Sequence, residues 1–386
     1  MNTRRLALCI LSLFAFAPSP FAADENFVPS NPPEMKPVDL AHSRANKTMA
    51  HFMRGANLGN YLEVPPGQNW RVHIAPEDFD HIKAEGFDHV RVPIGWQNYT
   101  GPGPEFKVDE EIFCKVDFVL TNALSRGLAV MLNIHNFDAF TSNTVAETDH
   151  FLAIWRQVAE HYAKLPDTVV FELLNEPKDA ATTEVMNPIY ARALAEIRKT
   201  NPQRTIVVGP GRWNQISELK KLILPNDDDN LIVTVHCYDP FSFTHQGASW
   251  AGPRVRVKGI LFPGPPPTPL VPDPSLDLPK SALDWIDRYN TLPGTNNPSS
   301  PIAFEGELKY AHQWSQYYGR PLHVGEFGCF TTADAASRAH FYSAFRHACE
   351  EQHLGWAIWD WNAGFRYWNE RQNEPMPGMR DALFGK

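Results

Sequence analysis

The sequence has few cysteines and, beyond its N-terminus, no long apolar run. A membrane helix needs about 20 consecutive apolar residues, and no later stretch approaches that length, so we expect no membrane partner. No two cysteines are spaced as a CxxC pair, which argues against a structural zinc site. The cysteines are Cys9, Cys114, Cys237, Cys329 and Cys349.

Positive charge is also scarce. The chain carries 35 Lys and Arg residues against 44 Asp and Glu residues, a formal net charge of −9. An acidic protein repels the phosphates of nucleic acids and anionic lipids, so neither is an expected partner. No Gly-rich phosphate-binding fingerprint follows any predicted strand, and we expect no metal or organic cofactor. Aromatic residues, by contrast, make up 12% of the chain, which suits a surface that stacks on flat, neutral ligands.

The N-terminus has the order of a secretory signal peptide. Arg4 and Arg5 precede an apolar run over residues 6–17, and small residues follow at 22 and 23. We predict that residues 1–23 are removed and that the mature chain is secreted or periplasmic. Its charge would then be −11, because Arg4 and Arg5 leave with the signal. An uncleaved N-terminal anchor is the alternative interpretation.

Residues 24–47 are polar and Pro-rich, so we predict a flexible arm. Residues 48–386 are predicted to form the catalytic domain and to act as a monomer. In an oxidising compartment, the four cysteines that follow the signal allow three disulfide pairings, and the sequence does not choose among them. We favour buried free thiols, because a domain of this size does not depend on disulfides.

Eight short apolar stretches alternate with helical patterns along the chain. This alternation predicts a single-domain α/β fold, a (β/α)8 TIM barrel, with a doubly wound open sheet as the alternative. The predicted strands are 53–58, 89–93, 129–134, 169–174, 205–208, 231–236, 322–326 and 355–359. The predicted helices are 76–85, 110–126, 148–164, 183–200, 304–318 and 333–352.

One connection is much longer than a barrel requires. Between Ser242 and Pro301 the chain carries a Pro-rich insertion, with five prolines from Pro263 to Pro269. Such a segment is stiff and extended and does not fit a barrel wall. We predict a loop on the catalytic face that borders a cleft, or else a plain excursion over the surface.

Polar side chains stand at the carboxyl ends of the predicted strands, which meet at one end of a parallel barrel. Burying such groups is costly unless they contact one another or a ligand. Pro177 directly follows Glu176 and favours extended geometry there, at the end of its strand. The candidate site residues are Arg91, His135, Asn136, Asn175, Glu176, His236, Tyr238, Glu326 and Trp359.

Glycoside hydrolysis requires a pair of carboxylic side chains, and Glu176 and Glu326 supply such a pair. Arg91 and Tyr238 are suited to keep Glu326 ionised, since one is a fixed cation and the other a hydroxyl donor. Asn175 would hold a sugar hydroxyl, and His236 would tune the proton on Glu176. A non-catalytic carbohydrate-binding barrel is the alternative of a different class. A metal hydrolase built on His135 and His236 lacks a convincing set of carboxylate ligands.

In these motifs the chain resembles glycoside hydrolase family 5, the cellulase family, over roughly residues 51–362. The resemblance rests on Arg91, His135, Asn175-Glu176-Pro177, His236 with Tyr238, Gly325-Glu326-Phe327-Gly328 and Trp359. It implies a retaining endoglucanase that cleaves internal β-1,4 bonds of cellulose-like or mixed β-glucans. Mannan, xyloglucan and β-1,3-glucan are the alternative substrates.

The resemblance also implies roles for single residues. Glu176 would be the acid/base and Glu326 the nucleophile, with carboxyl groups about 5 to 5.5 Å apart. Trp250 would be a sugar platform, and Trp359 is preferred to Trp361 as a second one. His135 is followed by Asn136, where many relatives have a second histidine, so contacts to the outer hydroxyls of the reacting sugar differ here.

Several other polar and aromatic residues are interpreted as structural. Glu172 is predicted to form a salt bridge, Asp138 and Asp239 to cap loops, and His245 and His323 to be satisfied within the fold. Five tryptophans are predicted to pack in the core or between helices, namely Trp70, Trp96, Trp155, Trp285 and Trp314.

Overall fold

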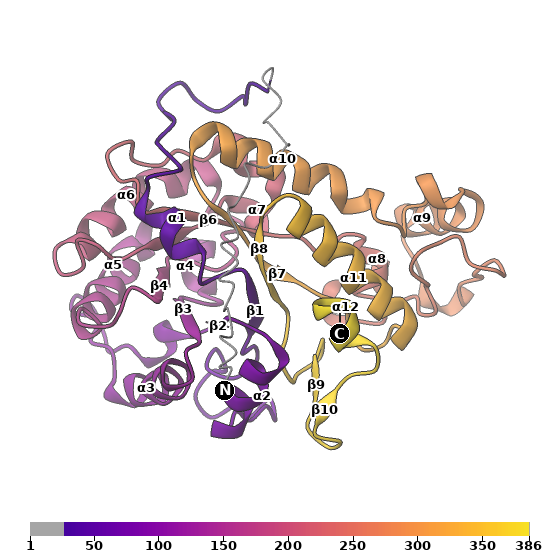
Figure 1. Cartoon of the computed structure of the whole chain (residues 1–386), viewed down its shortest axis with the longest axis horizontal. Coiled ribbons are helices and arrows are strands. Elements are labelled where there is room, and N and C mark those ends of the chain that lie inside the picture. The colour runs from indigo at the N-terminus through magenta and orange to yellow at the C-terminus, as the bar shows by residue number, and fades with distance from the viewer. Residues whose placement is uncertain (1–26, 386) are drawn as a thin grey trace, which may run out of the picture.

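The computed structural model describes residues 27–385, in which eight parallel strands close into a barrel (Figure 1). Each strand pairs with the next along the chain, and β1 pairs with β8. This confirms the predicted TIM barrel, since an open sheet would leave two edges. The strands are β1 (Arg54–Asn57), β2 (His89–Val92), β3 (Ala129–Asn133), β4 (Val169–Glu172), β5 (Ile206–Val208), β6 (Leu231–His236), β7 (Leu322–Phe327) and β8 (Gly355–Ile358).

Helices surround the barrel, and their apolar stripes explain where they form. In α3, buried residues recur every three or four positions, as at Ile112, Val116 and Val119, and Asp109 caps the first turn by accepting from the Glu111 amide. The long outer helices are α2 (Pro76–Glu85), α3 (Glu110–Ser125), α5 (Thr144–His161), α6 (Thr183–Arg198), α10 (Ile302–Tyr318) and α11 (Ala335–Glu351).

The remaining α-helices and a two-stranded hairpin lie in the segments before, between and after these strands and helices. They are α1 (Arg44–Met49), α4 (Asp138–Ser142), α7 (Gly211–Asn214), α8 (Phe241–Thr244), α9 (Lys280–Thr291), α12 (Met379–Phe384) and a hairpin of β9 (Trp368–Asn369) and β10 (Glu374–Pro375). The predicted signal peptide, residues 1–23, lies outside the described residues. Within residues 27–385, no helix combines the length and the apolar character needed to cross a bilayer.

The predicted arm is not separate from the barrel where the structure describes it. From Phe27 onward it lies against the domain: Asn31 donates to the carbonyls of Leu219 and Leu222 at 2.7 and 2.9 Å, and it accepts from the Trp314 indole at 3.0 Å. Met35 is buried. The prolines that suggested a linker instead fix an extended segment that is held by hydrogen bonds to the barrel.

The end of the same segment closes the bottom of the barrel. Ala45 and Met49 of α1 form one apolar cluster with Val170, Val207 and Ile232, which lie at the amino-terminal ends of their strands. An open barrel end would expose this apolar layer to water. The helix α1 is short and has few buried residues, so its apolar periodicity was too weak to predict this closure of the barrel from the sequence.

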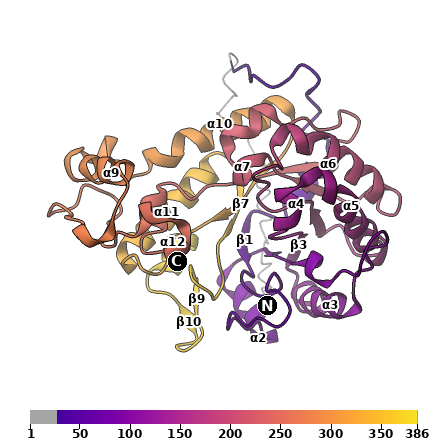
Figure 2. The ribbon, with the colours of Figure 1, turned by 180° about the vertical axis from the view of Figure 1, so that it is seen from behind.

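Most of the insertion between β6 and α10 lies beyond the barrel, whereas its first residues, including His245 and Trp250, stay at the carboxyl end of the barrel. Figure 1 shows α9 projecting at one end of the molecule, beyond α8 and α11, and Figure 2 shows the same projection beyond α11 from behind. The Pro-rich stretch is irregular and no part of it joins the barrel wall, as predicted. The cysteines Cys114, Cys237, Cys329 and Cys349 are all free, as favoured, and three of them are buried. Cys114 is exposed, so its predicted burial was wrong.

The plug at the bottom of the barrel yields a stability prediction. We expect Met49→Ala to lower the free energy of unfolding by about 2–5 kcal/mol, because it opens a cavity among fully buried side chains. Lys47→Ala, on the exposed face of α1, is the matched control and should change it by less than about 0.5 kcal/mol. Urea unfolding followed by tryptophan fluorescence measures both. Equal effects of the two substitutions would contradict the plug.

Candidate active site

A cleft of about 980 Å³ lies across the carboxyl-terminal end of the barrel. Such a cleft is where parallel barrels gather their functional side chains. Arg91 and His236 lie beneath its floor, within hydrogen-bond reach of the residues above them. Its lining includes the other predicted site residues: His135, Asn136, Asn175, Glu176, Tyr238, Trp250, Glu326 and Trp359.

The floor of the cleft is organised by Arg91, which is fully buried. Its guanidinium has five N–H donors, and five hydrogen bonds of 2.6 to 2.8 Å leave it. Burial alone would lower the pKa of Arg91, but the adjacent carboxylates more than offset this, so it stays charged. The five acceptors are Glu172 Oε1, Glu172 Oε2, Glu326 Oε1, Asn175 Oδ1 and Asn57 Oδ1.

The partners of Arg91 extend the network into the barrel wall. Asn57 donates to the carbonyls of Gly325 and Ile358 at 3.0 and 3.1 Å, which joins β1 to β7 and β8. Glu172 takes the two parallel bonds of a bidentate pair. It is therefore the structural salt bridge predicted from its place in β4.

Glu326 is held at both carboxylate oxygens. Oε1 accepts from Arg91 at 2.7 Å and Oε2 from the Tyr238 hydroxyl at 2.8 Å. Burial raises the pKa of Glu326, and the neighbouring His236, the Arg91 charge and the Tyr238 hydrogen bond work against that rise. The carboxylate thus has a cation and a donor directed at its charge, in agreement with the partners expected from the sequence.

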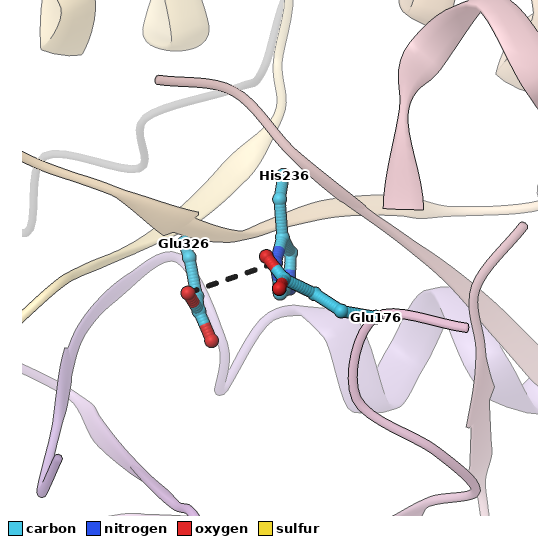
Figure 3. A group of neighbouring side chains, drawn as sticks. All are labelled: Glu176, His236 and Glu326. Atoms are coloured by element: carbon cyan, nitrogen blue, oxygen red, sulfur yellow. Dashed lines mark hydrogen bonds and ion pairs between the residues drawn. The ribbon is translucent and has the colours of Figure 1, made fainter. Parts of the chain in front are cut away.

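Glu176 lies opposite Glu326, with His236 between them (Figure 3). His236 Nδ1 is 2.9 Å from Glu176 Oε1 and 3.7 Å from Glu326 Oε2. One oxygen of each carboxylate and this nitrogen all lie within 4.8 Å of one another. Although 27% of the Glu176 side chain is exposed, loss of water in the cleft raises the pKa of Glu176 to about 7, against the opposing charges of Arg91 and Lys178.

The backbone of Glu176 differs from the expected extended geometry. Its φ is +47°, in the left-handed region that residues other than glycine seldom adopt. Pro177 disfavours the right-handed helical region but does not enforce an extended one. A left-handed turn after β4 is compatible with the contact between the side chain and His236, and such backbone strain is common at functional sites.

His236 is neutral at ordinary pH, because burial lowers its pKa to about 4 despite the nearby Glu326. The amide nitrogen of buried Asn214 lies 3.3 Å from Nε2. Nε2 therefore accepts a hydrogen bond, and Nδ1 carries the proton that is donated to Glu176. Asn214 ends the short helix α7 after β5 and was missed in the sequence, because a single asparagine in a connecting segment gives no signal.

The cleft floor continues from Glu326 to a stacked pair, His135 and Trp359. Their rings are nearly parallel, at 6°, with centroids 5.7 Å apart. A Cβ on Gly59 would lie 2.8 Å from the Trp359 ring, so only glycine admits the indole there. Burial, with the Arg91 charge, lowers the pKa of His135 well below its usual value. Trp361, the alternative platform, is fully buried and donates to Asp78 at 2.8 Å.

Exposed tryptophans from two separate loops line the cleft. Trp250 is 65% exposed and meets Phe330 edge to face at 4.9 Å. Trp70, 42% exposed, belongs to the loop after β1. It lines the cleft, so its assignment to the core was wrong, whereas Trp96, Trp155 and Trp314 are fully buried as predicted.

Other residues of the lining were also missed. His245, predicted to be structural, lines the cleft, although its Nδ1 is satisfied by the Thr244 hydroxyl at 3.0 Å. The sequence offered little sign of the rest, because they come from loops outside the strand-end motifs. They include Asn60, Arg71, Asn362, Phe365, Glu370 and Arg371.

The atoms of Glu176, His236 and Glu326 are spaced closely enough to hold a metal ion. Each of these groups already has a hydrogen-bond partner in the site. The geometry is therefore accounted for by the hydrogen bonds alone. His135 does not join this group, so the metal-hydrolase set considered from the sequence, His135 with His236, is not assembled among the described residues.

Two carboxylates that face each other across the mouth of a (β/α)8 barrel, in unlike environments and beside aromatic platforms, define a glycoside hydrolase. The model of the family described as cellulase, glycosyl hydrolase family 5, matches residues 53–365. The chain belongs to this family.

Relatives with known names agree with this assignment. The chain is 29% identical to endoglucanase H of Acetivibrio thermocellus, in an alignment that covers 86% of the present chain. It is 27% identical to endoglucanase 3 of Fibrobacter succinogenes, in an alignment that covers 85% of the present chain. It spans only 31% and 52% of the lengths of those two proteins.

Solved structures show the same architecture. Cel5A of Thermotoga maritima in complex with cellobiose is 33% identical, with a TM-score of 0.76 over 88% of this chain and 99% of that one. The same enzyme in complex with mannotriose is 32% identical, with a TM-score of 0.73 over the same shares of the two chains.

The Arg91 network yields a second prediction. Lysine would keep the charge but supplies three donors in place of five. We expect Arg91→Lys to destabilise the fold by about 3 kcal/mol, since it leaves buried acceptors unpaired, and to lower hydrolysis of an aryl β-cellobioside at least about 100-fold.

Arg192→Lys is the matched control, because Arg192 is exposed and has one ion pair, with Asp149 at 3.2 Å. It should leave both quantities unchanged. Thermal unfolding and steady-state rates measure the two variants. Wild-type behaviour of Arg91→Lys would show that the five hydrogen bonds are dispensable.

Proposed function

We propose that the protein is a retaining endo-β-1,4-glucanase in which Glu326 is the nucleophile and Glu176 the acid/base. The observation that carries the proposal is the unequal setting of two carboxylates within 4.8 Å of each other. The 4.8 Å limit joins one oxygen of each carboxylate, and such a close pair favours the retaining class, whose carboxyl groups are roughly 5 to 5.5 Å apart, over the inverting class at roughly 6.5 to 9.5 Å. Glu326 has the charged partner Arg91, whereas the side-chain hydrogen-bond partner of Glu176 within residues 27–385 is a neutral imidazole.

The first step forms a bond between a Glu326 oxygen and the anomeric carbon of the sugar. The glycosidic C–O bond breaks, and the leaving oxygen takes its electron pair and the proton of Glu176. In the second step, Glu176 takes a proton from water, and the water oxygen attacks the anomeric carbon and displaces Glu326. Both carboxyl groups return to their starting protonation states.

The sugar would be positioned by side chains around this pair. Asn175 accepts from Arg91 through its amide oxygen, so its amide nitrogen remains to donate to a sugar hydroxyl. His135 and Asn136 would contact the outer hydroxyls of the reacting sugar, and Trp359 and Trp250 would stack on sugar rings. A non-catalytic carbohydrate-binding barrel is disfavoured, because both carboxylates and their partners are in place.

Internal cleavage is proposed because exposed aromatics from two separate loops, Trp70 after β1 and Trp250 after β6, line the cleft that holds the catalytic pair. A chain could then extend past the catalytic pair in both directions. The substrate proposed is a cellulose-like or mixed β-glucan, on the basis of the endoglucanase relatives and the cellobiose complex. A β-mannan is the second candidate, because the similar Thermotoga enzyme has been solved with mannotriose.

We further propose that the protein acts as an exported monomer. The basic, apolar and small-residue order of residues 1–23 supports export. The catalytic pair and its hydrogen-bond partners need no residue from a second copy, which is compatible with action as a monomer. Signal cleavage would be checked by N-terminal sequencing of the protein recovered from outside the cytoplasm.

The pKa of Glu176 predicts the pH dependence. An acid catalyst must be protonated, so kcat/KM on an aryl β-cellobioside with a poor leaving group should fall as pH rises through about 7. A dinitrophenyl leaving group needs no proton, and its basic limb should weaken or vanish. The same basic limb on both substrates would remove Glu176 from the acid role.

Substitutions distinguish the catalytic roles of the two carboxylates. We expect Glu326→Gln to abolish hydrolysis of both substrates, and Glu176→Gln to lower the rate on the poor leaving group by about 100- to 10,000-fold. On the dinitrophenyl substrate, Glu176→Gln should still release a burst of phenol equal to the enzyme concentration. Glu305→Gln, an exposed carboxylate on α10, is the control. Full activity of Glu326→Gln would contradict the assignment.

Product analysis identifies the substrate and the cleavage mode together. On a panel of cello-, manno-, xyloglucan and β-1,3-gluco-oligosaccharides, we expect the cello-oligosaccharides to be cleaved fastest. Internal cleavage should yield a mixture of product lengths from the earliest times. Faster cleavage of manno-oligosaccharides would make mannan the substrate, and steady release of a single short product would indicate exo action.

A further inference from the structure

The insertion between β6 and α10 forms a second recess, behind the wall of the catalytic cleft. Its volume is about 710 Å³, and its lining comes from the loop after β6, from η4 (Pro253–Val255) and from α9. Trp285, predicted to pack in the core, is only half-buried and faces this recess. The residues used in the argument are Asp239, Phe241, Arg254, Trp285 and Arg288.

One stack of side chains separates the recess from the cleft. His245 lines the cleft, and its ring lies 4.0 Å from the ring of Phe241 at an angle of 12°. Phe241 lines the recess and carries the Arg254 guanidinium at 4.4 Å from its centre. Trp250 lines the cleft only four residues before Arg254. The cleft and the recess are therefore separated by a single stack of three side chains, His245, Phe241 and Arg254.

The recess offers an aromatic surface and donors without protein partners. Trp285 stacks on the buried Tyr289 at 16°, which fixes the plane of the indole. Within residues 27–385, neither the Arg254 nor the Arg288 guanidinium has a hydrogen bond or an ion pair with another side chain or carbonyl. Fixed aromatic faces beside planar hydrogen-bonding groups suit sugars, which have apolar ring faces and hydroxyl edges.

The charges around the recess favour a neutral ligand over an anion. Asp239 contributes a carboxylate to the lining. Glu307 lies against Asp239, with one oxygen of each within 4.8 Å of the other and of Cys237 Sγ. The Asp239 carboxylate in the lining, with a second carboxylate beside it, opposes the binding of a phosphate or sulfate, and the Asp239 carboxylate accepts hydrogen bonds from hydroxyl groups.

We propose that this recess binds a segment of β-glucan chain, so that a long substrate is held both in the catalytic cleft and behind its Trp250 wall. This inference rests on the proposed function. The second contact would raise the affinity for polymers through effective concentration and would add nothing for substrates that fill only the cleft. The insertion that the barrel does not need thereby acquires a role in selecting long chains.

The test compares a polymer with a short substrate on four proteins: the wild type, Trp285→Ala, Arg288→Ala and the control Leu283→Ala. Leu283 is on the same helix, is 46% exposed and does not line the recess. We expect the two recess variants to lower kcat/KM on soluble mixed-linkage β-glucan about fivefold. Their kcat/KM on an aryl β-cellobioside and their melting temperatures should equal those of the control.

Affinity electrophoresis in gels that contain the same β-glucan gives a readout independent of hydrolysis. The recess variants should be retarded less than the control. If Trp285→Ala does not fold, the comparison is made with Arg288→Ala alone. The Arg288 side chain is exposed, and its removal leaves the backbone hydrogen bonds of α9 intact.

Three results would overturn the inference: equal polymer rates and retardation in all four proteins, a parallel loss on the short substrate, or retardation abolished by millimolar inorganic sulfate. The last result would mark an anion site. If the wild type hydrolyses neither substrate, the proposed function fails, and the gel assay still decides whether the recess binds glucan.

Discussion

One buried guanidinium fixes the geometry of the active site. All five N–H groups of the Arg91 guanidinium donate hydrogen bonds, to acceptors on β1, β4, β7 and the loop after β4. A charge without water is tolerated only when its hydrogen bonds are complete. The strands must therefore meet in one register for Arg91 to be satisfied, and that register places Glu326 and Asn175 on the cleft floor. Fold stability and catalytic geometry depend on the same contacts.

Around this fixed charge, two carboxylates of the same chemical type become different. Glu326 shares Arg91 with Glu172 and receives the Tyr238 hydroxyl. Glu176 receives a single hydrogen bond from a neutral imidazole, and burial raises its pKa to about 7. Environments that push two pKa values apart are how one site supplies both an acid and a base. The proposed retaining mechanism needs this asymmetry as much as it needs the spacing.

The strands, the long helices and the catalytic constellation could be predicted because each has a strong local signal. Apolar runs mark the strands, and polar residues at their carboxyl ends mark the site. The bottom plug around Met49, the left-handed turn at Glu176 and the cleft position of Trp70 were not predictable in this way. These features depend on which surfaces meet in three dimensions. The local sequence around a single tryptophan does not show whether its side chain lies in a core, in a cleft or in a recess such as the one at Trp285.

The central claim is that Glu326 forms a covalent bond to the sugar while Glu176 handles the proton. A 2-deoxy-2-fluoro cellobioside with a good leaving group slows both steps and allows the intermediate to accumulate. Mass spectrometry of the intact protein, followed by peptide mapping, locates the adduct. We expect one fluoro-cellobiosyl group per chain, on the peptide that contains Glu326. An adduct on Glu176, or product released by inversion with no adduct, would contradict it.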